Sequence, residues 1–186
     1  MSEFLPAWEF MRPHEYNHQR NFTNIPGDPG GATMWGITVR ALQGHGTLYD
    51  LNKDGVVDVA DLKLMTEEQS RDEFYKPYYW DAPKLYLLDS QRIASKVFDM
   101  GVNLGPARAI MYLQQVIQAF GSKILVDGHL GPVTAKLAAS LNEQRVLDGL
   151  VLALCDHYTT WVGSNPVERT QFLDGLMARA RSLPNA

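Results

Sequence analysis

The sequence predicts a mainly α-helical protein with a small β-hairpin region. Of its 186 residues, 45% are hydrophobic, and 15 glycines and 10 prolines are close to average usage, which is typical of a globular chain. From about residue 90 onward, apolar side chains recur at helical spacing in several consecutive stretches. Residues 21–46 instead are rich in Gly, Pro, Asn and Thr around a β-prone run at 35–39, which predicts turns and short strands.

The first half contains two helix signals. Phe4, Trp8 and Met11 fall on one helical face and predict a short first helix that runs towards Glu15. Thr66 followed three residues later by Gln69 forms a capping-box pattern, which predicts that another helix begins there.

The second half is predicted to be helical throughout. Ser90 is a suitable N-cap, and Pro106 and Pro132 stand where prolines are tolerated, in the first turn of a helix. Apolar stripes at 143–161 and 168–182 predict two further helices that face a core. We therefore divide the chain into residues 1–90 and residues 91–186, packed together as one compact unit.

Charge and targeting signals exclude several classes of protein. The net charge is −4 and Lys and Arg do not cluster, so nucleic acid is not an expected partner. No stretch reaches the roughly 20 apolar residues of a transmembrane helix, and the N-terminus lacks the pattern of a signal peptide. The lone Cys155 cannot form an intramolecular disulfide and suits a reducing compartment. We expect a monomer that is made in the cytoplasm.

Glu15 is the leading candidate for a catalytic residue. It follows the first helical stretch and precedes the turn-rich run Pro26-Gly27-Asp28-Pro29-Gly30-Gly31, where alternating Pro and Gly favour tight turns that orient Asp28 and Thr33. Cleavage of a glycosidic bond needs a carboxylic acid that protonates the leaving oxygen, and a second group that positions water or stabilises the positive charge. Glu15 together with Asp28 and Thr33 offers both parts. The plain alternative is that Glu15 is a solvated surface charge.

Several short motifs resemble, in order, those of the glycoside hydrolase family 108 muramidases, a lysozyme-like group found in phage endolysins and in some secretion-accessory lysozymes. The resemblance extends over about residues 8–183. It rests on the residues around Glu15, on Asn24-x-Pro26-x-Asp28-Pro29-Gly30-Gly31-x-Thr33-x-x-Gly36-Ile37-Thr38, and on the later runs Tyr78-Tyr79-Trp80-Asp81, Phe98-Asp99-x-Gly101-Val102-Asn103 and Asp127-Gly128-x-Leu130-Gly131-Pro132-x-Thr134.

The resemblance implies a lysozyme-like fold and an N-acetylmuramidase that cleaves the β-1,4 bond between N-acetylmuramic acid and N-acetylglucosamine in bacterial peptidoglycan. Glu15 takes the place of the catalytic acid, although Tyr16 and Asn17 replace the two glycines that usually follow it. The resemblance also implies a peptidoglycan-binding role for residues 91–186. It is consistent with an endolysin that a holin releases to the periplasmic cell wall, where it lyses the bacterium.

Other interpretations remain open from the residues alone. Candidates for sugar binding are Trp35, Tyr79, Trp80 and Asn103, but aromatic clusters of this kind serve packing more often than sugar stacking. A zinc site at His14, His18 and His45 is disfavoured, because further ligands at suitable spacing are missing. A non-hydrolytic peptidoglycan-binding or secretion-accessory protein is the main alternative function.

A twelve-residue acidic loop fits the pattern of a calcium-binding loop. Gly55 allows the sharp turn, and the closing residue is an aspartate where sensor loops have the longer glutamate. The predicted ligands are Asp50, Asn52, Asp54, Val56 through its carbonyl, Asp58 and Asp61. Such a Ca²⁺ ion would be structural, because glycoside hydrolysis by a carboxylic acid needs no cofactor. The alternatives are a solvated loop and a calcium-dependent interaction module.

Overall fold

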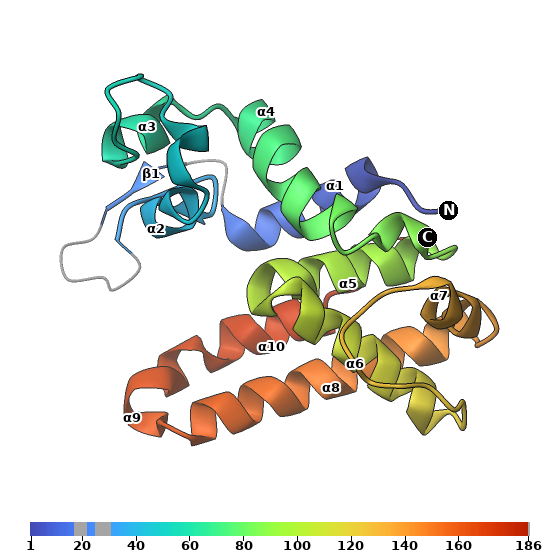
Figure 1. Ribbon diagram of the computed structural model, residues 1–186. Helices are drawn as coiled ribbons and strands as arrows, with labels where there is room; N and C mark the ends of the chain where they lie inside the picture. The colour runs from blue at the N-terminus through green and yellow to red at the C-terminus, as the bar shows by residue number, and fades with distance from the viewer. Residues whose placement is uncertain (17–21, 25–30, 186) are drawn as a thin grey trace. The chain divides into compact units, whose positions relative to one another are not determined.

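The computed structural model describes residues 1–16, 22–24 and 31–185. It is mainly α-helical with one small antiparallel sheet (Figure 1), which confirms the predicted fold class. Contacts within the chain divide it into two compact units: Arg12–Pro77, and Met1–Met11 together with Tyr78–Ala186. We refer to them as the sheet unit and the helical unit.

These units differ from the division at residue 90 that the sequence suggests. Their boundaries fall inside helix α1 (Phe4–Glu15) and inside the π-helical segment η2 (Ser70–Asp81). The N-terminal residues belong with the helical unit because Phe4 packs in a core of aromatic rings there. Its ring centroid lies 5.9 Å from that of Trp80 and 5.6 Å from that of Phe98.

The sheet unit is built from short elements. Among the residues that the structure describes in this unit, three strands pair in the order β1-β2-β3, all antiparallel. Two capping boxes begin helices: Asp58 with Asp61 at α3, and Thr66 with Gln69 at α4, the second as predicted. The elements are β1 (Phe22–Thr23), β2 (Thr33–Met34), β3 (Ile37–Thr38), α2 (Val39–Gln43), η1 (Gly46–Tyr49), α3 (Val59–Leu64) and α4 (Glu67–Gln69).

The helical unit buries the apolar stripes seen in the sequence. Helix α5 packs on α6, and α8 packs on both α6 and α10. Ser90 caps α5, and Pro106 and Pro132 occupy the first turns of α6 and α7, as predicted. The elements are η3 (Leu85–Leu87), α5 (Gln91–Leu104), α6 (Pro106–Ala119), α7 (Pro132–Ala139), α8 (Glu143–Gly163), α9 (Pro166–Arg169), η4 (Thr170–Phe172) and α10 (Leu173–Arg181). The single helix predicted at 168–182 is thus divided into three short segments.

Buried charged side chains hold α10 against α5. Arg179 donates from Nε to Oδ1 of Asp99 over 3.0 Å and from Nη2 to the Asp99 carbonyl over 3.1 Å. Lys96 donates from Nζ to the carbonyls of Arg179, Ala180 and Ser182 at 3.1, 3.0 and 2.8 Å. The ammonium therefore donates to carbonyl groups at the C-terminal end of α10, where the helix itself supplies few N–H partners. Within the described ranges, no helix combines the length and the apolarity needed to cross a bilayer.

Candidate active site

Glu15 is the last residue of α1 and belongs to the sheet unit. Its side chain is half-buried, and its Oε1 atom is shielded from solvent. The neighbouring residues are fixed by Glu67 of α4, whose Oε1 accepts hydrogen bonds from the Tyr16 hydroxyl at 2.6 Å and from Arg12 Nη1 at 3.3 Å. The backbone on both sides of Glu15 is therefore anchored.

The β2–β3 hairpin places its turn against Glu15. The pairing of Met34 with Ile37 leaves Trp35 and Gly36 as a two-residue loop, with φ angles of 53° and 76°. Positive φ at both positions defines a type I′ turn, which matches the twist of the flanking strands. A Cβ atom on Gly36 would lie 2.9 Å from Cβ and 3.2 Å from Oε2 of Glu15, so this position needs glycine for space as well as for conformation.

Trp35 adopts a backbone conformation that is unusual for a bulky residue, and three contacts hold it there. Its Nε1 donates to the Met65 carbonyl at 2.8 Å, and its own carbonyl accepts from the Tyr75 hydroxyl at 3.0 Å. Its ring meets that of Tyr16 edge to face, with centroids 5.4 Å apart. The indole is thus fixed beside Tyr16, the residue that follows Glu15, and Trp35 stays a predicted residue for sugar contact.

Tyr75 belongs to this site, although no sequence pattern singles it out. A Cβ atom on Gly36 would lie 2.7 Å from its hydroxyl and 3.2 Å from the Glu15 carboxylate, so both groups border the same glycine. In the sequence Tyr75 is one of several aromatic residues on a helix, and only the packing of η2 against the hairpin turn distinguishes it. Because the Tyr75 proton is donated to the Trp35 carbonyl, the phenol oxygen offers only an acceptor to a protonated Glu15 carboxyl group beside it.

Of the other two predicted catalytic residues, the structure describes Thr33 but not Asp28. Thr33 lies on β2, where its hydroxyl makes a short hydrogen bond with that of Thr23 on the paired strand β1. Asp28 lies outside the described residues, as does His18. The role of Thr33 as a group that positions water stays a prediction.

The remaining candidates for sugar binding belong to the helical unit. Trp80 is 3% exposed and packs among Phe4 and Phe98, so it serves the core in this structure. Tyr79 is half-buried on η2. Asn103 is exposed near the end of α5, where its Oδ1 accepts from the Tyr158 hydroxyl at 2.7 Å beside a pocket of about 340 Å³.

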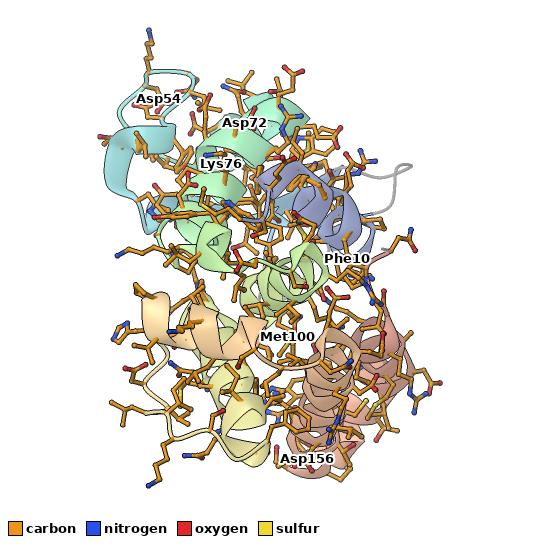
Figure 2. All side chains as sticks on the ribbon, turned by 90° about the vertical axis from the view of Figure 1, so that its right-hand side faces the viewer. Phe10, Asp54, Asp72, Lys76, Met100 and Asp156 are labelled. Atoms are coloured by element: carbon orange, nitrogen blue, oxygen red, sulfur yellow. The ribbon has the colours of Figure 1, made fainter. Side chains whose placement is uncertain are left out.

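The acidic loop is organised by hydrogen bonds to its own backbone. The Asp50 carboxylate accepts from the N–H groups of Asp54 and Gly55 at 3.1 and 2.9 Å, and Gly55 has a φ of 91°. Asp54, labelled in Figure 2, is exposed and accepts from the N–H of Val56 at 2.9 Å. Turns of this kind curl a loop so that side-chain oxygens can face a cation.

Asp61 fits the role of closing ligand less well. It is 0% exposed, its Oδ1 accepts from the N–H groups of Leu51 and Asn52, and its Oδ2 accepts from that of Asp58. Burial raises the pKa of Asp61, but these backbone hydrogen bonds lower it further, and the net pKa lies below the ordinary value. Among residues 1–16, 22–24 and 31–185, no three His, Cys, Asp or Glu side chains lie close enough together to hold a metal ion.

Comparisons with known proteins agree with the resemblance seen in the sequence. Residues 16–105 match the model of the family described as glycosyl hydrolase 108, and this match begins directly after Glu15. The structure of Brucella abortus SagA is similar in fold, with a TM-score of 0.60, 23% sequence identity, and coverage of 91% of this chain and 93% of that chain. A search of curated proteins gave no match. The family match supports a glycoside hydrolase, and the resemblance to glycosyl hydrolase family 108 on a lysozyme-like fold is therefore confirmed.

Proposed function

We propose that this protein is a peptidoglycan hydrolase of the N-acetylmuramidase type, with Glu15 as its general acid. The observation that carries the proposal is the placement of the half-buried Glu15 carboxyl group against the Trp35–Gly36 turn, beside the Tyr75 hydroxyl. The match of the following residues to a glycosyl hydrolase family supports a glycosidic substrate.

In the proposed reaction, protonated Glu15 donates its proton to the oxygen that links N-acetylmuramic acid to N-acetylglucosamine. The bond between this oxygen and the anomeric carbon then breaks, which leaves positive charge on the muramic acid ring. Water adds to the anomeric carbon and passes a proton to the solvent, from which the Glu15 carboxylate takes up a proton again, so that both products are neutral at the cleaved bond. Thr33 and Asp28 are the proposed groups for positioning that water, and Tyr75 is placed to orient the Glu15 carboxyl group.

Replacement of Glu15 by glutamine tests this proposal. Purified peptidoglycan is incubated with the wild type, with Glu15→Gln and with Glu9→Gln, which changes an exposed glutamate on the same helix. We expect Glu15→Gln to lower the rate of turbidity loss by roughly 10²- to 10⁴-fold, the usual contribution of general acid catalysis. Mass spectrometry should detect new reducing-end muramic acid in the products of the wild type and of Glu9→Gln.

The main alternative is a protein that binds peptidoglycan without hydrolysing it. The large pocket of the helical unit, described below, favours some binding function for residues 91–186. The same experiment separates the two functions, because a binding protein would co-sediment with peptidoglycan and release no sugar in any variant. Bacterial lysis as an endolysin, with holin-dependent access to the periplasm, is part of the proposal for the enzyme and is tested by expression together with a holin.

A further inference from the structure

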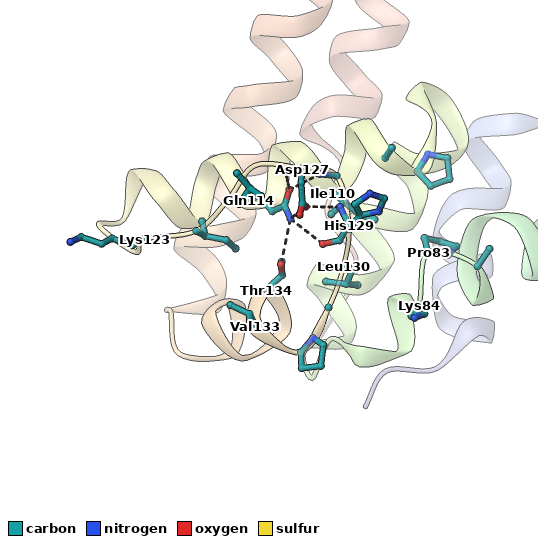
Figure 3. A pocket seen from close by; sticks show the side chains of 18 of the residues that line it. Pro83, Lys84, Ile110, Gln114, Lys123, Asp127, His129, Leu130, Val133 and Thr134 are labelled. Carbon is teal, nitrogen blue, oxygen red and sulfur yellow. Dashed lines mark hydrogen bonds between the residues drawn. The ribbon is translucent and has the colours of Figure 1, made fainter.

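One pocket of the helical unit, about 780 Å³ in volume, plays no part in the proposed catalysis. Its walls come from the start of α6, the loop 120–131, the first turn of α7 and the segment around Pro83 and Lys84 (Figure 3). All of these segments lie within one compact unit. The pocket is therefore a feature of the helical unit alone.

One buried side chain fixes the shape of this pocket. Gln114 is 1% exposed, and its Nε2 donates to Asp127 Oδ1 at 2.8 Å, to the His129 carbonyl at 3.0 Å and to Thr134 Oγ1 at 3.4 Å (Figure 3). Its Oε1 accepts from the N–H groups of Asp127 and Gly128 at 3.0 and 2.9 Å. A single amide thus ties the loop to α6 and to α7, so the wall of the pocket is held in place before any ligand binds.

Gly128 brings the loop close to α6. Its φ is 75°, and a Cβ atom there would lie 2.9 Å from the carbonyl oxygen of Ala107. Any other residue at this position would push the loop away from the helix. The loop is therefore built to lie against α6 in this one conformation.

The rim of the pocket carries charges of both signs. Lys84 and Lys123 are exposed at opposite ends of the view in Figure 3, and neither makes an ion pair within the described part of the chain. The Asp127 side chain accepts hydrogen bonds from His129 N–H at 2.9 Å and from Gln114, and both reach Oδ1. Its Oδ2 accepts neither of these bonds and can accept from a donor on a ligand. The same two bonds lower the pKa of Asp127 below its ordinary value.

The pocket also exposes apolar side chains beside these charges. Leu125 is 74% exposed and Val133 is 66% exposed, and Ile110 and Leu130 contribute buried apolar surface to the lining. Among the described residues that line the pocket, Tyr78 is the one Phe, Tyr or Trp side chain. A site for a glycan strand usually offers broad aromatic faces, whereas this lining suits small aliphatic groups carried between charged ones.

We propose that this pocket binds a short peptide that carries both carboxylates and an amine, namely the stem peptide of peptidoglycan. Lys84 and Lys123 receive the carboxylates, Asp127 Oδ2 accepts from the amine of a diamino acid, and Leu125 and Val133 contact the methyl groups of alanine residues. The identity of the peptide as a wall component rests on the proposed function, whereas the preference for a zwitterionic peptide rests on the pocket itself.

Isothermal titration calorimetry on the full-length Glu15→Gln protein tests this inference without hydrolysis of the probe. The probes are a soluble muramyl tetrapeptide that contains diaminopimelate and an uncharged N-acetylglucosamine tetramer. Added to the Glu15→Gln background, Asp127→Asn keeps the Oδ1 acceptor but turns Oδ2 into a donor, and Lys84→Gln with Lys123→Gln removes both cations. We expect each change to weaken binding of the tetrapeptide by about tenfold or more, the effect of losing one charge-assisted contact, and to leave binding of the tetramer unchanged.

Lys136→Gln is the matched control, because Lys136 is an exposed lysine on α7 outside the pocket lining. Unchanged melting temperatures show that the variants are folded, and the exposed lysine pair gives a test that leaves the Gln114 and Asp127 hydrogen bonds of the loop intact. The inference is wrong if the tetrapeptide does not bind, or if the lysine pair and Asp127→Asn bind it as tightly as Lys136→Gln. Failure of the proposed catalysis would show separately, as wild-type protein that binds the tetrapeptide but releases no sugar from peptidoglycan.

Discussion

The hydroxyl group of Tyr75 donates a 3.0 Å hydrogen bond to the carbonyl of Trp35, in the turn that lies against Glu15. This bond joins η2 to the β2–β3 hairpin across forty residues of sequence. It supports a tryptophan at positive φ, a conformation that needs compensation from its surroundings. The arrangement of the candidate active site therefore depends on residues that are far apart in the chain.

Loss of this hydroxyl should reduce activity more than stability. Tyr75→Phe removes one hydrogen bond, and we expect a decrease of about 1 kcal/mol in the free energy of unfolding. We also expect kcat to fall at least about tenfold, because small displacements of a catalytic group are costly. Tyr49→Phe is a matched control, since the buried Tyr49 donates a 2.7 Å hydrogen bond to the Glu73 carbonyl. Equal kcat values for the two variants would contradict a role for Tyr75 in positioning Glu15.

Gly36 should tolerate no side chain. Gly36→Ala places a Cβ atom 2.7 Å from the Tyr75 hydroxyl and 2.9 Å from Glu15 Cβ. Gly31→Ala is the control, because Gly31 also has a positive φ, of 69°, but no atom lies within 4 Å of its ideal Cβ. We expect Gly36→Ala to lose about 1–3 kcal/mol more in urea unfolding than Gly31→Ala does, which is the usual effect of overpacking. We also expect it to lose most of its activity. Similar losses in both variants would mean that conformation alone matters here.

Lys96 should make the free energy of unfolding depend on pH in the alkaline range. Burial lowers the pKa of Lys96 from 10.5 to about 8, and nearby Arg179 lowers it as well, while Asp99 and Cys155 oppose the shift. Between about pH 8 and pH 10.5 the unfolded chain therefore binds more protons at this residue than the folded chain does. The contribution of Lys96 to the free energy of unfolding should rise with pH across this range.

Urea unfolding of the wild type and of Lys96→Met at several pH values measures this contribution. The difference between the two proteins cancels the titration of groups that they share, such as Tyr112, whose pKa is raised by burial. We expect the wild type to gain stability relative to Lys96→Met from pH 8 to pH 10. A constant difference would show that the pKa of Lys96 is not lowered.

The acidic loop remains a predicted calcium site, and thermal unfolding tests it. If the loop binds Ca²⁺ only when folded, calcium at a hundred times its Kd should raise Tm by roughly 5–10 °C. Asp54→Asn should reduce this shift, whereas Asp156→Asn, which changes an exposed aspartate on α8, should preserve it. Chelation with EDTA should leave the rate of sugar release unchanged at temperatures where the protein is folded. An unchanged wild-type Tm would favour the solvated loop, which Asp61 closes through its own hydrogen bonds.

Local patterns in the sequence were sufficient for much of the fold. Apolar spacing and capping residues predicted the helices α5 to α8, and the capping box at Thr66 and Gln69 is present in the structure. The turn-rich run correctly indicated a hairpin, because glycine at the second turn position is a local requirement of its geometry. These features depend on residues only a few positions apart.

Contacts between distant segments decided the roles of residues that local sequence patterns do not encode. Tryptophan is a residue type that commonly contacts sugars, but the packing of Trp80 with Phe4 and Phe98 makes it a core residue. The same packing places the N-terminal residues with the helical unit. Tyr75 and Gly36 became part of the candidate site only when η2 met the hairpin. The sequence by itself determined the helices, the hairpin and the candidate acid Glu15, because periodicity, caps and turns act locally. The surroundings of Glu15 and the pocket built on Gln114 depended on contacts between distant segments, which no local pattern encodes.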